Sequence, residues 1–276
     1  MRSNALTTTA IALVLWSIPG ATGAAIVVLG ALSQEKTVEV GKTYQGAIRV
    51  RNPGDTPQTV RIYQTDYRFF SDGRNLYGEP GKDPRSNANW ITLSPTLLTI
   101  PPKEEVAVNY RIAVPADKSL RGTYWSMIMV EGTGDAGSVP LAAVSGKARI
   151  AVRQVIRYGV QVVTDIGDTG TRNLKLNARL VRADGKRLLQ VDVANTGERW
   201  LRPSLWAQLF DEKGKFIGKF AGASARVYPG TSIRKSIDLS SVSVGTYKAL
   251  VVADAHEDSV YGATYTLKLG REKAAK

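Results

Sequence analysis

Apolar residues recur at every second position of the chain, in short segments separated by Gly, Pro, Asn and Asp. This period is typical of strands with one buried face, whereas an amphipathic helix repeats every three to four residues. No stretch longer than about ten residues carries a helical stripe. We therefore predict an all-β chain, with strands at residues 47–50, 60–67, 106–112, 125–130, 150–163, 174–181, 189–193, 205–210 and 247–252.

The same succession of motifs occurs once in each half of the chain. In each half, an apolar strand ends in a turn sequence and is followed by a proline break, an alternating strand and a Gly-Thr-Tyr triplet that opens another strand. Two copies of one sandwich explain this better than one large barrel. The paired motifs lie at 52–55 and 195–198, 101–102 and 229–230, 106–112 and 233–239, and 122–124 and 245–247.

The turn residues at 165–170 interrupt the strand pattern and mark a domain boundary. A glycine before a tyrosine at the start of a late strand suits the corner of an immunoglobulin-like sandwich. We predict two immunoglobulin-like β-sandwich domains in tandem, at 24–163 and 173–270, with a linker at 164–172 and a basic tail at 271–276. Residues 71–89, rich in Gly, Pro and Asn, are predicted to form a long surface loop.

Residues 1–23 have the features of an export signal. Arg2 gives a basic start, residues 10–16 are apolar, and residues 21–24 offer small side chains for cleavage. The apolar run is too short for a comfortable membrane span. We predict an exported protein, in which membrane contact arises only if this leader stays attached as an anchor.

The sequence has 37 Lys and Arg against 24 Asp and Glu, a net charge of +13, or +12 once Arg2 leaves with the leader. Such a charge favours an acidic partner, whether nucleic acid, an anionic surface polymer or an acidic protein. Export makes nucleic acid the least suitable of these, so we predict no nucleic-acid partner, and a merely solvated basic surface is the alternative. The chain has no cysteine, so its stability must come from hydrophobic cores and not from disulfides.

Catalysis needs groups that change protonation or ligation, and the chain has one histidine and no cysteine. This composition excludes cysteine nucleophiles and metal sites built from several histidines. Neither a phosphate-binding glycine loop nor Gly-x-Ser-x-Gly occurs, and nothing pairs Asp66, Asp72 or Asp83 for glycoside chemistry. We predict a protein that is not an enzyme and has no cofactor or metal.

Residues 146–163 form one predicted strand, much longer than the five or six residues typical of a sandwich strand. Its even positions are mostly apolar, while its odd positions include Arg149, Arg153 and Arg157. In one interpretation the even residues face the core and the arginines face water. In the other, the strand is a docking edge that captures an extended partner segment by strand addition.

Six short motifs follow one another along residues 40–163. They are Ala-Ile-Arg-Val-Arg-Asn at 47–52, Trp-Ile at 90–91 before Pro95, Leu-Thr-Ile-Pro-Pro at 98–102, Val-Asn-Tyr-Arg-Ile at 108–112, Gly-Thr-Tyr at 122–124 and Ile-Ala-Val-Arg-Gln-Val-Ile-Arg at 150–157. In their order and spacing they resemble the periplasmic pilus-assembly chaperones, the PapD-like family of two immunoglobulin-like domains joined at an angle. From residue 174 onward the resemblance is only to a generic immunoglobulin-like or fibronectin-like sandwich.

The resemblance implies that an apolar row on the last strand, here Ala148, Ile150 and Val152, completes the unfinished sandwich of a secreted pilus subunit. It also implies two cations that anchor the C-terminal carboxylate of that subunit, Arg157 on the same strand and Lys36 on the first strand. A guanidinium can grip a carboxylate through two hydrogen bonds, and an ammonium can add charge from the side.

The resemblance thus implies a periplasmic chaperone-like protein that binds exported subunits without cofactor or ATP. An outer-membrane usher would be a further partner, and a self-capping dimer would protect the docking edge. The alternative is a structural or adhesive cell-envelope module that binds acidic polymers or a partner complex. Salt separates the two, because surface-charge binding collapses as salt rises and strand addition persists.

Overall fold

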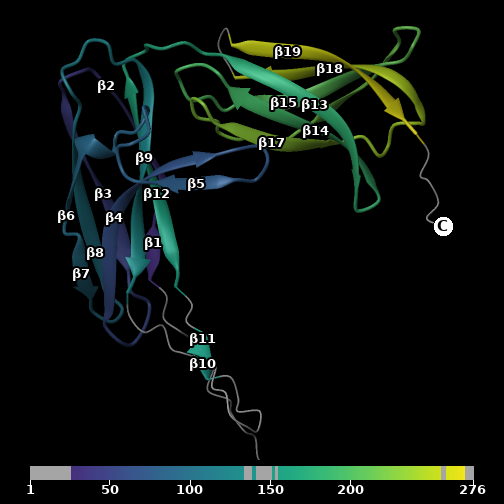
Figure 1. The fold of residues 1–276 in the computed structure, drawn as a ribbon. Coiled ribbons are helices and arrows are strands. Elements are labelled where there is room, and N and C mark those ends of the chain that lie inside the picture. Colours follow the sequence, from purple (N-terminus) through teal and green to yellow (C-terminus); the bar gives the residue numbers. More distant parts are fainter. Residues whose placement is uncertain (1–25, 134–138, 141–150, 153–154, 256–258, 271–276) are drawn as a thin grey trace, which may run out of the picture.

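The structure is a computed structural model that describes residues 26–133, 139–140, 151–152, 155–255 and 259–270. These residues form two β-sandwiches that meet in the shape of an L (Figure 1). The predicted fold class, an all-β chain with two immunoglobulin-like sandwiches in tandem, is confirmed. Within the described ranges the only helix is the 3-10 turn η1 (Ala88–Trp90), and no helix is long and apolar enough to cross a membrane.

The first domain packs two sheets around one core. One sheet has the order β1 (Val27–Leu29), β3 (Thr43–Arg51), β8 (Glu105–Ala113) and β6 (Ile91–Ser94). The other has the order β2 (Ser33–Val38), β12 (Arg157–Ile166), β9 (Gly122–Gly132), β4 (Gln58–Phe69) and β5 (Asn75–Gly78), with β7 (Leu97–Ile100) also paired to β4. On strands with one buried face, alternate residues point into the core, as Val108, Tyr110 and Ile112 do on β8.

The second domain repeats this architecture. Its three-stranded sheet has the order β13 (Leu174–Ala183), β14 (Lys186–Asn195) and β17 (Ser232–Asp238). Its four-stranded sheet has the order β16 (Phe216–Ala221), β15 (Ser204–Phe210), β18 (Gly245–Asp254) and β19 (Val260–Leu269). Leu189, Val191 and Val193 of β14 fill the core from one side, and Leu205 and Leu209 fill it from the other.

The turn after β3 is held by a buried asparagine. The side-chain oxygen of Asn52 accepts a hydrogen bond from the Gly54 N–H at 2.9 Å, and its amide donates to the Thr56 carbonyl at 2.7 Å and the Ile100 carbonyl at 3.1 Å. One fully buried side chain therefore closes the turn and ties it to the end of β7.

The repeat predicted from the sequence reappears here at the level of single hydrogen bonds. The side-chain oxygen of Asn195 accepts from the Gly197 N–H at 2.9 Å, and its amide donates to the Arg199 carbonyl at 2.7 Å and the Val227 carbonyl at 3.0 Å. Asn195 therefore braces the second domain in the same way as Asn52 braces the first.

Three predicted segments differ from the structure in their bounds or content. In the described residues the strand expected at 146–163 is instead β11 (Ala151–Val152), paired with β10 (Val139–Pro140), followed by β12, which begins at Arg157. β12 runs on to Ile166, so the linker starts later than predicted. The expected loop at 71–89 contains β5, because residues 75–78 continue the ladder of β4.

An aromatic cluster joins the two domains. Tyr228 of the second domain stacks on Trp125 of β9, with ring centroids 4.8 Å apart and planes 12° from parallel. The Tyr228 hydroxyl donates to the side-chain oxygen of Gln161 at 2.8 Å, and the Trp200 indole N–H donates to Asp165 at 2.9 Å. Burial of Trp125 and Tyr228 gives this junction an apolar centre with polar contacts around it.

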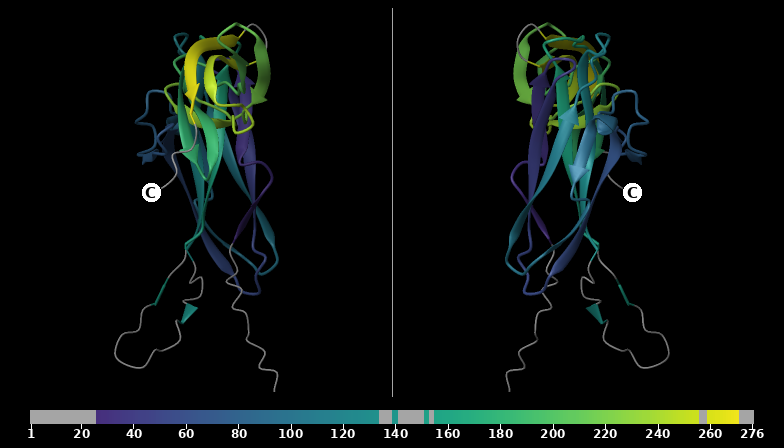
Figure 2. Two further views of the ribbon diagram at one scale, coloured as in Figure 1. Left: turned by 90° about the vertical axis from the view of Figure 1, so that its right-hand side faces the viewer. Right: turned by 90° about the vertical axis from the view of Figure 1, so that its left-hand side faces the viewer.

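The β4–β5 hairpin makes a second contact between the domains. It projects from the first sandwich toward the second (Figure 1). Arg68 donates to the Gly230 carbonyl at 2.8 Å, and the Ser71 N–H donates to the Ser232 hydroxyl at 2.9 Å. The views in Figure 2 show that the β10–β11 pair lies beyond the opposite end of the first sandwich.

We predict that Asn52→Ala and Asn195→Ala each lower the free energy of unfolding by about 2–4 kcal/mol, since each leaves buried backbone groups without a partner. Urea unfolding followed by tryptophan fluorescence measures the loss. Asn177→Ala on the exposed side of β13 is the matched control and should change stability by less than about 0.5 kcal/mol. Equal stability of all three variants would contradict the bracing role.

Candidate functional site

The candidate site begins at an incompletely paired edge of β12. On one side β12 pairs with β9 along its whole length, from Arg157 to Ile166. On the other side β2 pairs with it in parallel, but only from Gln161 onward. The Gln161 N–H donates to the Leu32 carbonyl at this edge. Because the backbone groups of every second residue of a strand point to the same edge, those of Gly159 and Arg157 also face this side. Within the part of the chain that the structure describes, residues 157–160 have no strand on that side.

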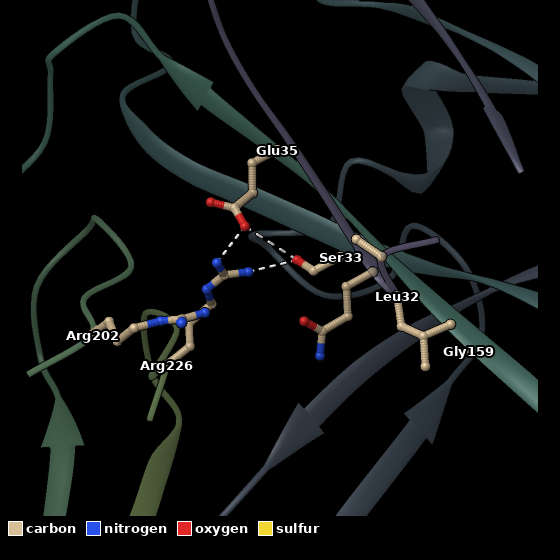
Figure 3. A pocket seen from close by; sticks show the side chains of 8 residues that line it. Leu32, Ser33, Glu35, Gly159, Arg202 and Arg226 are labelled. Atoms are coloured by element: carbon tan, nitrogen blue, oxygen red, sulfur yellow. Dashed lines mark hydrogen bonds and ion pairs between the residues drawn. The ribbon is translucent and has the colours of Figure 1, made fainter. Parts of the chain in front are cut away.

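A cavity of about 510 Å³ lies where β2 begins and the open edge ends. It is lined from both domains, so it exists only in the angle between them. Figure 3 shows the arginines entering from the second domain opposite residues of β2 and β12. The lining residues are Ala31, Leu32, Ser33, Glu35, Gly159, Gln161, Arg202 and Arg226.

Arg226 is the better buried of the two arginines in this cavity, with its side chain 13% exposed. It forms an ion pair with Glu35, donates to the Ser33 hydroxyl at 2.5 Å, and lies over the Trp200 ring at 4.3 Å. Burial disfavours its charge, but the Tyr228 hydroxyl and Glu35 outweigh burial, and the pKa of Arg226 is raised. This guanidinium therefore stays charged and already holds one carboxylate.

Arg202 lines the same cavity and is exposed. Among the described residues it forms no ion pair or hydrogen bond. It also lines a second cavity of about 390 Å³, beside Arg172 and Arg199. Because Glu35 balances the charge of Arg226, the guanidinium of Arg202 carries the net positive charge of the cavity and makes it suited to an anionic group.

Arg157, predicted to anchor a carboxylate, lies at the start of the open edge of β12 and is already engaged. Its Nε is 2.9 Å from Oε2 of Glu131, which also lies 3.5 Å from Arg61 and accepts from the Tyr63 hydroxyl at 2.9 Å. Burial acts to raise the pKa of Glu131, but the Tyr63 hydrogen bond, Arg157 and Arg61 outweigh burial, and the pKa is lowered.

The structure does not bring Lys36 and Arg157 together. Lys36 of β2 pairs with Thr164, seven residues along β12 from Arg157. At about 3.3 Å per residue the two positions are about 23 Å apart. Residues an odd number apart also point to opposite faces of a strand. One carboxylate cannot be gripped by both cations in this arrangement, contrary to the expectation that they act as a pair.

The apolar row of the predicted docking strand falls largely outside the described residues. Ala148 and Ile150 lie outside them, and Val152 pairs with Val139 in the short β10–β11 ladder. Farther along, the even residues Val160 and Val162 are buried in the core of the first domain. From Arg157 onward, therefore, the even row belongs to the core.

The carboxylates considered in the sequence bind their own surroundings. Asp66 accepts hydrogen bonds from the N–H groups of Gly81, Lys82 and Asp83 at 2.7–2.9 Å, which folds the segment after β5 onto β4. Asp72 pairs with Arg74 at 2.7 Å. The described part of the chain contains no cluster of His, Asp and Glu placed to bind a metal, and His256 lies outside it.

Arg202 and Arg226 were not predicted from the sequence, because their site is formed by contacts between residues that are far apart along the chain. Arg226 meets Ser33 and Glu35, about 190 positions away in sequence. The only local signal is that Arg226 stands just before the proline break at 229–230. Nothing in the second domain alone indicates that its arginines face a strand of the first.

No protein-family model matches the sequence, and no curated protein matches it. Solved structures of fimbrial chaperones are similar over most of the chain. The YadV chaperone is 12% identical, with a TM-score of 0.41, over 88% of this chain and 99% of its own. The class 5 fimbriae chaperone CfaA is 13% identical, with a TM-score of 0.44, over 87% and 98%.

A third similar structure is the CsuC–CsuE chaperone–tip adhesion subunit pre-assembly complex from Csu pili of Acinetobacter baumannii. The matched chain is 16% identical, with a TM-score of 0.42, over 88% of this chain and 98% of its own. Fimbrial chaperones are thus among the solved structures to which the chain is similar, at low identity.

We predict that Arg157→Ala raises the pKa of Glu131, because one of the two arginines that stabilise its charge is lost. A pH titration of the glutamate carboxyl carbons by NMR measures the midpoint. Because the folded pKa is lowered, the stability contributed by ionised Glu131 is present at neutral pH and is lost as the pH falls through that value. Arg49→Ala, which removes the partner of Glu105, is the control; a Glu131 midpoint that moves equally in both variants would disprove the assignment.

Proposed function

We propose that the protein is a periplasmic chaperone-like protein that binds an exported subunit by strand addition on β12 and holds a carboxylate of that subunit in the cavity between the domains. The observation that carries the proposal is the open edge of β12 at residues 157–160, which ends at a cavity with two arginines from the second domain. Catalysis has no part in this function, and neither cofactor nor ATP is required.

Strand addition suits this edge because the position of an added strand follows from that of β2. β2 occupies the same side of β12 from Ser33 onward, so a guest strand at residues 157–160 would continue the line of β2. Main-chain hydrogen bonds would supply affinity along this line. Leu32, which is 47% exposed, offers the end of the guest strand an apolar contact.

The direction of the guest follows from the charge of the cavity. A guest strand parallel to β12, as β2 is, would point its C-terminal end toward Leu32 and the cavity. Arg202 has its donors available there, so a carboxylate would find a partner that can donate two hydrogen bonds, while Arg226 stays paired with Glu35. An antiparallel guest would bring a positively charged amino terminus to the same two arginines.

Arg157 and Lys36 keep separate proposed roles. Arg157 stands at the other end of the open edge, 57% exposed, where it would flank the guest strand after exchanging Glu131 for a guest carboxylate. Lys36 is exposed on β2 and would add charge at the edge of the sheet. The apolar row Ala148, Ile150 and Val152 would lengthen the docking edge beyond the start of β12.

The experiment is affinity purification of the exported protein from the periplasm of its own host, with mass spectrometry of the proteins that stay bound at high salt. We expect one or two small secreted β-rich subunits. Arg202→Glu should lower their recovery by about tenfold or more, since it replaces attraction by repulsion at the carboxylate. Stability should change by less than about 0.5 kcal/mol, because Arg202 is exposed.

Arg111→Glu is the matched control, because Arg111 is an exposed arginine on β8, in the sheet that lacks β12. It makes the same change of charge and should leave recovery unchanged. Equal recovery from both variants would rule out anchoring by Arg202. Recovery of acidic polymer alone, lost as salt rises, would replace the chaperone proposal by the envelope-module alternative.

A further inference from the structure

The four-stranded sheet of the second domain breaks the usual alternation of a sandwich, in which the outward side chains are polar. On β15, Leu205, Ala207 and Leu209 belong to the core. Trp206 and Phe210 alternate with them and therefore point outward. Two large aromatic side chains thus lie on the solvent side of a central strand.

The neighbouring strand β18 extends this apolar surface. Ala249, Val251 and Ala253 belong to the core, so Leu250 and Val252 point outward. Val252 lies directly opposite Trp206 in the ladder between β15 and β18. Side chains opposite each other on one face of a sheet are in contact range.

Phe216 of β16 completes the surface. Its ring lies 5.6 Å from that of Phe210, and the residue is 53% exposed. We name the five outward apolar residues the outer strip. It crosses three adjacent strands of one sheet and consists of Trp206, Phe210, Phe216, Leu250 and Val252. Phe216 is exposed, Trp206, Phe210 and Leu250 are half-buried, and Val252 is buried between them.

The charges around the outer strip are almost all positive. Lys219 lies over the Trp206 ring at 4.0 Å, Lys248 stands opposite Phe210, and Lys268 stands opposite Thr246. Among the outward positions of β15, β16, β18 and β19, all of which are described, the only acidic residue is Asp254, at the end of β18. The turn at 211–215 adds two acids and two lysines, which balance.

We propose that the outer strip is a peripheral contact surface for an anionic lipid bilayer. Aromatic and aliphatic side chains on the outward face, ringed by lysines, are typical of surfaces that contact the headgroup region of such a membrane. Protein interfaces instead favour arginine and are depleted in lysine, and this face carries lysine alone. The charge and composition therefore select lipid over an acidic protein as the occupant.

Trp206 gives the contact a specific anchor. Its indole N–H is buried under its neighbours and has no hydrogen-bond partner among the described residues. When lipid phosphates draw Lys219 away from the ring, the N–H gains access to headgroup oxygens. Tryptophan favours this zone of a membrane because its ring is apolar and its N–H is polar.

The lipid contact and the binding of a guest do not compete for one surface. The first domain meets the second at Trp200, Arg226, Tyr228, Gly230 and Ser232, none of which belongs to the four-stranded sheet. The outer strip lies on the far face of the four-stranded sheet, on the other side of the sandwich. This contact is also independent of the leader, because it uses only residues of the exported domain.

Co-sedimentation of the exported protein with vesicles tests the proposal. Vesicles of phosphatidylcholine with added phosphatidylglycerol should bind it, and pure phosphatidylcholine should not. Binding should disappear near 1 M salt, where the screening length is about 3 Å. Lys219→Ala with Lys248→Ala should lower the partition coefficient about 25-fold, and Phe216→Ser about tenfold.

The control is Lys42→Ala with Lys175→Ala, which removes the same charge from exposed positions outside the outer strip and should lower binding much less. Unfolding midpoints confirm that each variant is folded. No sedimentation with any vesicle, or equal losses in the face and control variants, would overturn the proposal. Salt-sensitive capture of an acidic envelope protein, lost in Phe216→Ser while vesicles stay free of the chain, would also overturn it.

Discussion

Stacking of Tyr228 on Trp125 is the contact on which the arrangement of the two domains depends. Domains joined by a short linker move relative to each other unless their interface has a substantial apolar part. Here the two rings lie 4.8 Å apart at the centre of the junction. Hydrogen bonds from Tyr228 to Gln161 and from Trp200 to Asp165 surround the two rings. The cavity exists in this one orientation, because Ser33 and Arg226 come from different domains.

The fold was readable from the sequence where the interactions are local or repeated. The alternation of apolar and polar residues predicted the strands, because one face of each sheet lies in a core. The repeated turn after an apolar strand proved to be one structural device, in which Asn52 and Asn195 make the same set of hydrogen bonds. The strand β5 was missed because residues 75–78 are all exposed, so burial leaves no alternation for the sequence to show.

The candidate site was predicted only in part. Arg157 does stand at the open edge of β12, because its position follows from the strand itself. Its separation from Lys36 depends on the register between β2 and β12, which no local pattern encodes. Arg202 and Arg226 depend on the domain angle, and hence on Tyr228 and Trp125. The pattern of one strand thus predicted Arg157, whereas the arginines that the second domain brings to that strand leave no pattern in the sequence.

The positive net charge of the chain has to be considered together with the ion pairs that its arginines form within the protein. Arg157 at the open edge of β12 is paired with Glu131, and Arg226 in the cavity is paired with Glu35. The charges of these two arginines are therefore balanced within the protein. Each of these two arginines has an internal carboxylate as its partner. Arg202 is left as the cation available to a guest. Net charge alone therefore does not mark the proposed docking site. Of the two arginines of the cavity, Arg202 has no acidic partner among the described residues, because the junction between the domains brings Glu35 to Arg226.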